Sequence, residues 1–258
     1  MTTAKTDIPS LSIVIPLYNE EERFPVTGET LRSFVTASVV TFPELEIIFV
    51  NDGSTDNTLA LVQKFARDFP HHVQIISHEK NRGKGHAVRT GMRAATKKYA
   101  LMSDADMSTD LCAAADFIGP MSDGVPVIIG SRKMPGARLE IRQPWWREFM
   151  GKGYTFLAQN ILSVPVSDFT CGFKFFHIDA RSAIFEKAMI DRWSYDAEIL
   201  FLAKQNNFPI VEIPVIWRND KRSAVRLYRD VIRSFLDLII IRLRHTPRTR
   251  GTKNQKQK

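Results

Sequence analysis

The sequence predicts an α/β fold with a mostly parallel central sheet flanked by helices. Short apolar segments rich in β-branched residues alternate with helical segments, and short connections join them. Several apolar segments are followed at once by polar residues, as at Asn51-Asp52-Gly53-Ser54 and Asp104-Ala105-Asp106. Because open α/β sheets bind ligands outside the carboxyl ends of their strands, these polar clusters predict one shared site.

The first half of the chain contains five expected strands. The first begins at Leu11 and is stopped by Pro16, and its unbroken apolar character is typical of a strand buried in a parallel sheet. Asn19 and the acidic residues after it are expected to open a helix, since carboxylates favour the positive end of the helix dipole. The strands are expected at 11–16, 46–50, 73–76, 99–102 and 125–130, and further helices at 58–69 and 86–96.

The alternation is less regular after Ser131, where residues 132–147 are basic and aromatic. Residues 224–244 have the pattern of a long amphipathic helix, with apolar residues such as Leu238 and cations such as Arg233. Residues 246–258 are expected to be a disordered basic tail. The remaining expected elements are helices at 148–162 and 195–204 and strands at 173–177 and 210–217.

The composition excludes several classes of protein. With 258 residues, of which 44% are hydrophobic and 25% charged, the chain is neither disordered nor fibrous. Its two cysteines, Cys112 and Cys171, are too few for a disulfide framework, which favours a reducing compartment. The N-terminal segment lacks the apolar stretch of a secretory signal, and no segment reaches the ~20 apolar residues of a membrane span. We therefore expect a cytoplasmic protein, soluble or peripheral on the cytoplasmic face of a membrane.

The positive charge is concentrated at the C-terminal end. The whole chain carries +8, and residues 218–258 alone carry +10, from 13 Lys and Arg against three Asp and Glu. The body before them is therefore close to neutral, and an anionic partner is expected at the C-terminal end. The apolar face and arginines of helix 224–244 suit the plane of an anionic bilayer, and packing on the domain explains that face equally well.

Asp104-Ala105-Asp106 is the sharpest candidate for chemistry. Two carboxylates so close repel one another, and a cation between them relieves the repulsion. Oxygen ligands select hard ions such as Mg²⁺ or Mn²⁺, which commonly bridge protein carboxylates and substrate phosphates. An isolated Asp-x-Asp is more often a helix cap and a solvated loop acid. Its place at a strand end, with similar clusters on neighbouring strands, favours the metal.

Three further segments carry residues that could bind a ligand. Asp52 could accept a hydrogen bond from a base or a ribose hydroxyl, whereas Asp56 is expected to be a turn or capping residue. Gly83-Lys84-Gly85 suits an anion but lacks the P-loop pattern, and considered alone it is expected to be a solvated turn. Asp168 is a candidate acid, base or acceptor-side group, and the nearby Cys171 is expected to be a packing residue.

These motifs resemble family 2 inverting glycosyltransferases of the GT-A fold, the fold of nucleotide-diphospho-sugar transferases. The resemblance rests on IVIPLYNE, VNDGSTD, NRGKG and DAD in the family's order, and it continues through DFTCGFKFF, WSYDAE and EIPVIW. It is greatest to the dolichyl-phosphate β-glucosyltransferases and related polyprenyl-phosphate glycosyltransferases. Residues 10–245 would form one catalytic domain, with a nucleotide-sugar half at 10–131, an acceptor half at 132–223 and the amphipathic helix at 224–245.

The resemblance implies an enzyme that moves a hexose to a polyprenyl or dolichyl phosphate at a membrane surface, with glucose from UDP-glucose as the expected donor. It also implies Mg²⁺ or Mn²⁺ as the cofactor, bound by Asp106. No nucleic-acid partner is expected, because the acidic strand ends would repel phosphate without a metal. The nucleotide sugar would contact Pro16, Tyr18, Glu20, Asp52, Lys84 and Asp104. The catalytic residues would be Asp104, Asp106, Asp168 and Arg132, and the acceptor phosphate would contact Arg132, Arg222 and Ser223.

Two departures from the family leave alternatives open. Members often carry an N-terminal membrane helix, which we do not expect here, and a Ser-Lys-Leu segment where this chain has Ser223-Ala224-Val225. The rival reactions are mannosyl transfer from GDP-mannose and transfer to a saccharide acceptor. The alternatives from other classes are a sugar-nucleotide-binding protein without turnover and a basic nucleic-acid-binding module, although no recognised nucleic-acid motif is present.

Overall fold

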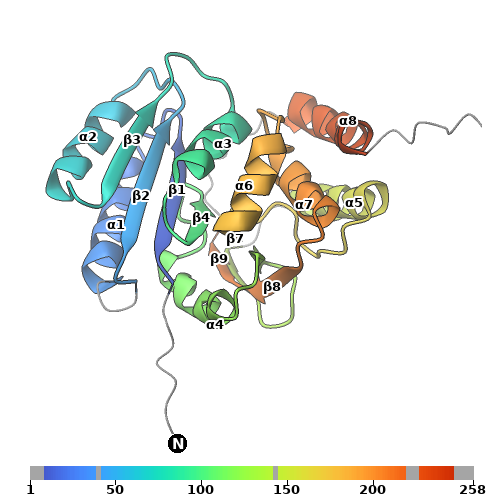
Figure 1. Cartoon of the computed structure of the whole chain (residues 1–258). Helices are drawn as coiled ribbons and strands as arrows, with labels where there is room; N and C mark the ends of the chain where they lie inside the picture. Colours follow the sequence, from blue (N-terminus) through green and yellow to red (C-terminus); the bar gives the residue numbers. More distant parts are fainter. Residues whose placement is uncertain (1–8, 39–41, 142–144, 219–226, 247–258) are drawn as a thin grey trace, which may run out of the picture.

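The computed structural model describes residues 9–38, 42–141, 145–218 and 227–246, and it has the expected α/β architecture (Figure 1). Within these residues the main sheet has seven strands in the order β3-β2-β1-β4-β7-β5-β8, and a small second sheet pairs β6 with β9. The strands are β1 (Leu11–Leu17), β2 (Leu45–Asn51), β3 (Val73–Ser77), β4 (Tyr99–Ser103), β5 (Val127–Ser131), β6 (Arg138–Ile141), β7 (Phe173–His177), β8 (Ile210–Pro214) and β9 (Ile216–Arg218).

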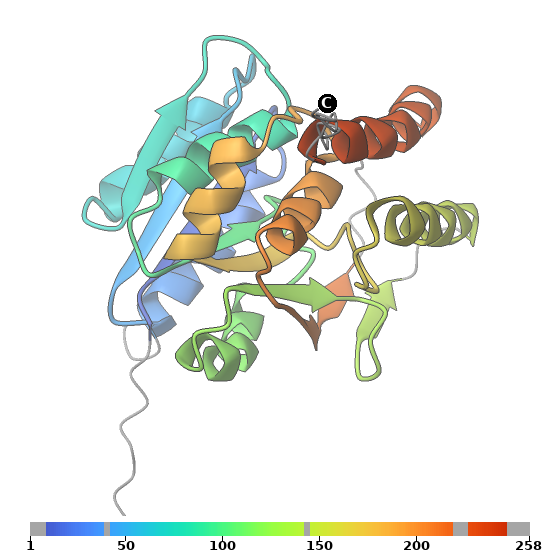
Figure 2. The same ribbon diagram turned by 45° about the vertical axis from the view of Figure 1, so that its right-hand side comes forward.

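Helices cover both faces of the main sheet (Figure 2). Successive side chains of a strand point to opposite faces, and in a strand such as β1, where every residue is buried, both faces have to be covered. Ile13 and Ile15 of β1 face one layer of helices, and Val14 faces the other. The first layer contains α1 (Phe24–Ser38), α2 (Thr58–Asp68), the 3₁₀ helix η1 (Leu111–Phe117) and α4 (Ile118–Ser122). The second contains α3 (Lys84–Ala94), α5 (Trp145–Leu162), α6 (Ile178–Lys187), α7 (Tyr195–Gln205) and α8 (Leu227–His245).

One antiparallel strand brings distant segments to the same edge of the sheet. β7 lies between β4 and β5 and is antiparallel to both, with Phe173 opposite Ser103 and Lys174 opposite Ile129. The start of β7 therefore lies beside the carboxyl ends of β4 and β5, and β1 and β2 end at this edge too. The polar segments that follow these strands are consequently close in space.

Several expected boundaries were wrong. α3 spans Lys84–Ala94 instead of 86–96, β5 begins at Val127 instead of 125, and α5 begins at Trp145 instead of 148. The helix expected to open at Asn19 begins at Phe24, because Asn19 is left-handed (φ 54°) and its side-chain oxygen accepts a hydrogen bond from the Thr55 N–H. β1 continues past Pro16 to Leu17. The strand expected at 210–217 divides after Pro214, which cannot donate to a ladder, into β8 and β9 of different sheets.

Four short elements were not expected: η1, α4, β6 and α6. β6 lies inside the basic and aromatic segment 132–147, and all four of its residues are exposed. η1, α4 and β6 are too short to give a clear apolar period, and the ten residues of α6 show only a weak one, so the pattern alone does not reveal them.

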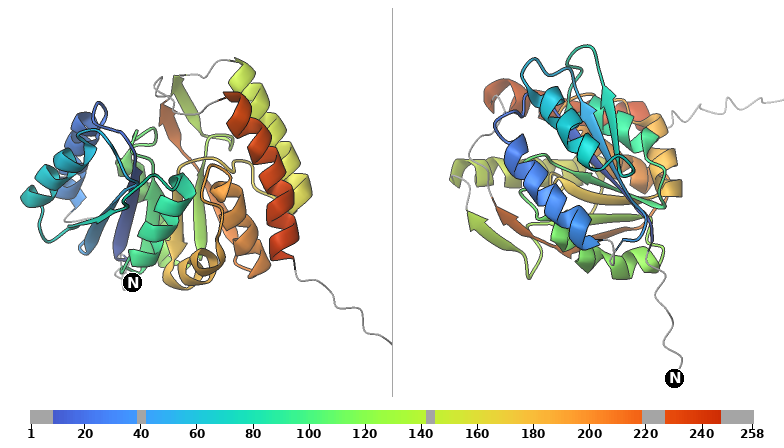
Figure 3. Two further views of the ribbon diagram at one scale, coloured as in Figure 1. Left: turned by 90° about the horizontal axis from the view of Figure 1, so that it is seen from above. Right: turned by 90° about the vertical axis from the view of Figure 1, so that its left-hand side faces the viewer.

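α5 and α8 lie alongside each other at the end of the molecule opposite α2 (Figures 1 and 3). Tyr154 of α5 contacts Phe235 of α8, with ring centroids 5.9 Å apart. His245 Nε2 at the end of α8 lies 2.8 Å from Glu198 Oε1 of α7. Residues 224–226 of the expected helix and the expected tail from residue 247 onward lie outside the described residues. None of the helices that the structure describes is both long and apolar enough to cross a bilayer.

Candidate active site

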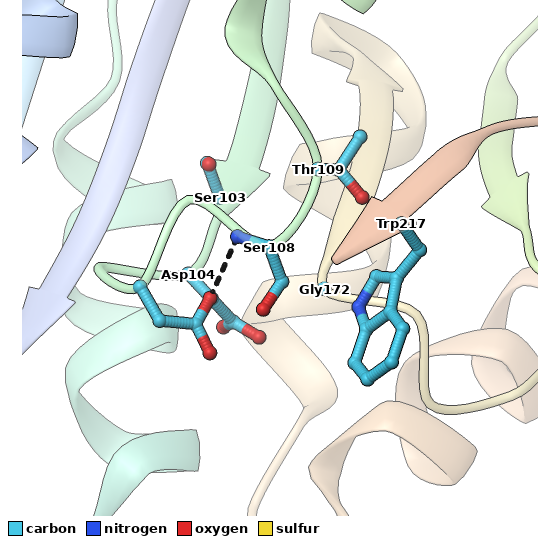
Figure 4. Close-up of a pocket in the computed structure, with 7 residues that line it drawn as sticks. Ser103, Asp104, Ser108, Thr109, Gly172 and Trp217 are labelled. Carbon is cyan, nitrogen blue, oxygen red and sulfur yellow. Dashed lines mark hydrogen bonds between the residues drawn. The ribbon is translucent and has the colours of Figure 1, made fainter. Parts of the chain in front are cut away.

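The candidate active site lies where β4 ends and β7 begins. Asp104 and Asp106 follow β4, Gly172 directly precedes β7, and Trp217 lies in β9. The Asp-x-Asp pair therefore faces residues that come much later in the chain. The pocket between them is lined by Ser103, Asp104, Asp106, Ser108, Thr109, Gly172 and Trp217 (Figure 4).

Asp106 is a partly buried carboxylate that lacks a cationic side chain in direct contact among the described residues. Its Oδ1 accepts a hydrogen bond from the Ser108 N–H at 3.0 Å, drawn as the dashed line in Figure 4. Burial and the neighbouring Asp104 carboxylate raise the pKa of Asp106. A bound cation would stabilise the ionised form, because it offsets both the lost hydration and the repulsion.

The groups around the pocket fit a hard divalent cation. Its lining offers carboxylate and hydroxyl oxygens and includes no sulfur or imidazole. Across the described ranges, no cluster of three or more His, Cys, Asp or Glu side chains is placed to hold a metal. Asp104 and Asp106 would thus leave coordination positions for water and phosphate oxygens, which is how Mg²⁺ is usually held at phosphate sites.

Lys84 brings a positive charge to the two carboxylates. Its Nζ lies 2.7 Å from Asp104 Oδ1 and 5.4 Å from the centre of the Trp193 ring. Burial disfavours the charged ammonium, but Asp104, Asp196 and Asp106 outweigh burial and raise the pKa of Lys84. Lys84 is therefore a cation at neutral pH, placed where a diphosphate bound at this pocket would need one.

The turn that carries Lys84 requires glycine on both sides. Gly83 has a φ of +109°, and a Cβ there would collide with the Asp191 carbonyl oxygen. A Cβ on Gly85 would collide with the Ile190 carbonyl oxygen. The expectation of a solvated turn was thus wrong, because the backbone of this turn packs tightly against the 190–192 segment.

Asp52 fixes the same turn from the other side. Its buried carboxylate accepts hydrogen bonds from the Gly83 N–H (2.8 Å) and the Arg82 N–H (3.1 Å), and it lies 2.8 Å from His78 Nδ1. These contacts position Lys84 indirectly. A contact of Asp52 with a nucleotide base or ribose stays a prediction.

The residues expected at the end of β1 lie at the same edge of the sheet. Pro16 is buried within β1, whereas Tyr18, the first residue after the end of β1, is 45% exposed. Burial, and to a smaller degree the nearby Asp106 carboxylate, raises the pKa of Glu20, so Glu20 and Asp106 are close enough to interact. Asp56 accepts hydrogen bonds from the N–H of Thr58, the first residue of α2, and from the N–H of Glu21 in the β1–α1 loop, as a turn or capping residue would. The contacts of Pro16, Tyr18 and Glu20 with a nucleotide stay predictions.

Arg132 and Asp168 form a buried, two-pronged ion pair. Arg132 Nε and Nη2 donate to the two oxygens of Asp168 at 2.7 and 2.8 Å. The Asp168 side chain is 0% exposed, and although burial favours its neutral form, Arg132 holds the pKa of Asp168 well below its usual range. A carboxylate held in this way is a poor proton acceptor, so the geometry favours Asp168 as a residue that positions Arg132 over one that transfers protons.

Arg132 lies next to the pocket because it packs against Trp217, one of the pocket-lining residues. Its guanidinium lies 5.3 Å from the centre of the Trp217 ring, and Nη2 also donates to Thr170 Oγ1 at 2.8 Å. Arg132 is thereby fixed beside the pocket that holds the Asp-x-Asp pair. Arg222 and Ser223, expected at the acceptor phosphate, lie outside the described residues.

Sequence reasoning missed Trp217, Gly172 and a second buried ion pair. Lys174 of β7 is fully buried, and its Nζ lies 2.5 Å from Asp196 Oδ1. Burial raises the pKa of Asp196 although Lys174 and Lys84 oppose this, so Asp196 is close enough to the Lys84–Asp104 pair to interact with it. The available signal was a lysine inside the otherwise aromatic strand Phe-Lys-Phe-Phe, since a buried lysine needs a partner.

Comparison with protein families and characterised proteins gives concordant matches. The model of the family described as Glycosyl transferase family 2 matches residues 12–185. The dolichyl-phosphate beta-glucosyltransferase of Homo sapiens is 31% identical, covering 91% of this chain and 75% of its own length. The protein of the same description from Saccharomyces cerevisiae is 33% identical, covering 90% of this chain and 74% of its own length.

Solved structures share the fold. Glucosyl-3-phosphoglycerate synthase from Mycobacterium tuberculosis in complex with UDP superimposes with a TM-score of 0.67 at 16% identity, covering 91% of this chain and 80% of that one. The same enzyme in complex with Mn²⁺, UDP-glucose and phosphoglyceric acid gives a TM-score of 0.67 at 15% identity, covering 91% and 79%. The expected α/β fold of the GT-A type is confirmed.

Proposed function

The chain belongs to glycosyl transferase family 2 and is a glycosyltransferase, and we propose that it transfers glucose from UDP-glucose to a polyprenyl phosphate. The observation that carries the proposal is the pocket at the β4–β7 edge. Two carboxylates, Asp104 and Asp106, line this pocket and would repel an anion in the absence of a bound cation. Two cationic side chains, Lys84 and Arg132, are held next to the lining residues. The activity named for the human and yeast relatives supports this choice of sugar and acceptor.

The donor is expected to bind on the β1, β2 and β4 side of the pocket. Asp106 and Asp104 would hold Mg²⁺ or Mn²⁺, and the ion would neutralise the diphosphate and the charge that develops on it. Lys84 is already ionised and already placed beside Asp104, so it contributes positive charge without rearrangement. The leaving UDP is thereby stabilised more than the bound donor.

The proposed reaction inverts the anomeric carbon. An oxygen of the acceptor phosphate forms a bond to C1 of glucose, and the bond from C1 to the diphosphate oxygen breaks, with its electron pair leaving on UDP. Because a phosphate oxygen is ionised near neutral pH, the nucleophile needs no strong general base. This agrees with the Asp168 carboxylate being fully engaged by Arg132.

The acceptor phosphate is expected to meet Arg132. Asp168 and Thr170 engage Nε and Nη2, and among the described residues no hydrogen bond occupies Nη1. A guanidinium fixed in this way presents donors to a phosphate without losing side-chain freedom on binding.

The rival functions differ in their ligands, so a thermal-shift panel separates them. UDP with Mn²⁺ near 100 times its Kd is expected to raise the Tm by about 5–10 °C, and UDP alone by much less. GDP with Mn²⁺ and an oligonucleotide are expected to give small shifts. A larger shift with GDP would favour the mannosyltransferase, and a larger shift with the oligonucleotide would favour the nucleic-acid-binding module.

Turnover decides the acceptor and excludes a binding protein without catalysis. Labelled glucose is expected to pass from UDP-glucose to a polyprenyl phosphate and not to an unphosphorylated saccharide. Transfer to the saccharide alone, or no transfer despite tight UDP binding, would reject the proposed function.

Replacing Gly172 with alanine is expected to displace the Asp104 carboxylate. A Cβ at Gly172 would overlap the carboxylate group of Asp104, so that side chain would have to turn away from Lys84. We expect kcat for glucosyl transfer to fall about 100-fold, since small displacements at a reacting centre have effects of this size. Gly119→Ala is the control, because a Cβ there meets nothing within 4 Å. Equal rates for the two variants would contradict the placement of Asp104.

A further inference from the structure

α8 exposes a second apolar face on the side away from the domain. Leu238 and Ile241 are buried against the body of the protein. Leu236, Ile239, Ile240 and Leu243 are exposed, and Leu243 reaches 72% exposure. Spacings of three, four and seven residues place these four side chains on one face of the helix. Packing therefore explains only one of the two apolar faces of α8.

α5 exposes large apolar side chains beside this face. Phe149 is 74% and Phe156 65% exposed, and Leu157 is also exposed. Phe149 and Phe156 are seven positions apart and so lie on one side of the helix. Exposing two phenylalanine side chains to water costs free energy, and contact with an apolar partner would recover it.

The two exposed faces adjoin across the contact between the helices. Tyr154 and Phe235 mark that contact, and the helices run side by side there (Figure 3, left). Leu157 follows Tyr154 by three positions and Ile239 follows Phe235 by four, so each exposed face begins next to the contact. The α5–α8 surface is defined here as Phe149, Phe156, Leu157, Leu236, Ile239, Ile240 and Leu243.

Exposed cations border the α5–α8 surface on both sides. Lys152 of α5 lies on the side of Phe149 and Phe156 that faces away from α8, by helix geometry, and Arg233 and Arg244 lie beyond Ile240 on α8. The acidic Asp237 of α8 is buried and does not contribute to this border. An apolar strip with positive edges matches the boundary between acyl chains and anionic headgroups.

We propose that the α5–α8 surface lies on an anionic lipid bilayer, with both helices parallel to the membrane plane. The proposal rests on the proposed function, because a polyprenyl-phosphate acceptor resides in a bilayer. The positive borders favour this occupant over a second copy of the chain, since paired copies would bring like charges together. The sequence suggested membrane contact for helix 224–244 alone, and the structure adds α5.

The α5–α8 surface is connected to the acceptor side of the pocket. Lys133, the residue after Arg132, donates from Nζ to Thr155 Oγ1 of α5 at 2.6 Å. A bilayer in contact with α5 is therefore one side-chain contact away from the backbone that carries Arg132. This arrangement lets the phosphate approach Arg132 while the polyprenyl chain stays in the membrane.

Vesicle binding by the full chain tests the proposal. Sedimentation is measured with vesicles of phosphatidylcholine alone and of equal parts phosphatidylcholine and phosphatidylglycerol. The wild type is expected to bind the anionic vesicles. The serine variant, which combines Phe149→Ser and Leu243→Ser, is expected to bind them at least about tenfold more weakly, since two side chains lose their apolar burial. The matched control is Val26→Ser with Ile178→Ser, two exposed apolar residues on α1 and α6, which is expected to bind like the wild type.

A charge variant tests the borders of the surface. Lys152→Gln with Arg233→Gln is expected to bind anionic vesicles about 30-fold more weakly, because each of the two cations near the membrane surface contributes about 1 kcal/mol. Binding of the serine variant equal to the wild type would overturn the proposal. A wild-type dimer that the serine variant converts to a monomer would also overturn it and identify a second copy as the occupant.

The acceptor used separates this proposal from the proposed function. With a short, water-soluble polyprenyl phosphate, the serine variant is expected to retain wild-type turnover. With a long-chain acceptor embedded in anionic vesicles, its turnover is expected to fall about tenfold, in line with its binding. A wild type that binds vesicles but transfers glucose to neither acceptor would reject the proposed function and leave the membrane surface standing.

Discussion

Asp106→Asn is expected to reduce glucosyl transfer about 1,000-fold while leaving the fold intact, since loss of a single electrostatic contact to a developing charge has effects up to this size. Asparagine can still accept the Ser108 N–H hydrogen bond through its amide oxygen, so the loop after β4 keeps its shape. It cannot hold a divalent cation as a carboxylate does, because it carries no charge. Transfer of labelled glucose from UDP-glucose measures the loss.

The thermal stability of Asp106→Asn gives a second test, because the metal-free variant is expected to be slightly more stable than the wild type although its activity is lost. Burial and Asp104 raise the pKa of Asp106, so its ionised form destabilises the metal-free fold above that pKa. Removing the charge is expected to raise the Tm without metal slightly and to abolish the extra stabilisation that Mn²⁺ adds to UDP. Asp116→Asn, an exposed carboxylate on η1, is the matched control. Turnover within about threefold of the wild type in Asp106→Asn would reject the metal assignment, since such a change is under 1 kcal/mol.

Arg132→Met is expected to cause a large loss of both stability and activity. The substitution leaves the Asp168 carboxylate buried without its partner, which costs about 3–5 kcal/mol in comparable cases. It also removes the cation expected to meet the acceptor phosphate. Denaturant unfolding at neutral pH measures the first effect, and glucosyl transfer measures the second.

The double variant Arg132→Met with Asp168→Asn separates the two effects. Neutralising both partners removes the stranded charge, so most of the free energy of unfolding is expected to return while transfer stays lost. Recovery of transfer together with stability would show that Arg132 acts only through the fold.

The pH dependence of stability follows from the same pair. Burial alone would raise the pKa of Asp168, but Arg132 holds it well below its usual range. The pair therefore stabilises the fold fully above the unfolded pKa of about 3.9, and this stabilisation is lost as the pH falls toward the lower folded pKa. The gap in free energy of unfolding between wild type and Arg132→Met is expected to be widest near neutral pH and to narrow below about pH 4. A constant gap across this range would contradict the charge argument.

Much of the first half of the fold could be predicted from local pattern. Buried strands such as β1 and β4 are continuous apolar runs, and their ends are marked by polar residues, so the expected bounds differ from the observed ones by one residue. The placement of Asp104 and Asp106 at the end of β4 follows from the same pattern. β6 and α6 could not be found in this way, because β6 has too few alternations and the apolar residues of α6 follow a helical period only weakly.

Strand periodicity and the order of the motifs determined the α/β class, the family resemblance and the edge of the sheet where the chemistry lies. The tertiary structure alone decided which charges neutralise one another there. Arg132 pairs with Asp168, and Gly172 abuts Asp104, because β7 inserts antiparallel between β4 and β5. Local pattern reports whether a residue is buried, but the partner of a buried charge depends on strand order, and strand order is set by long-range packing that no local period encodes.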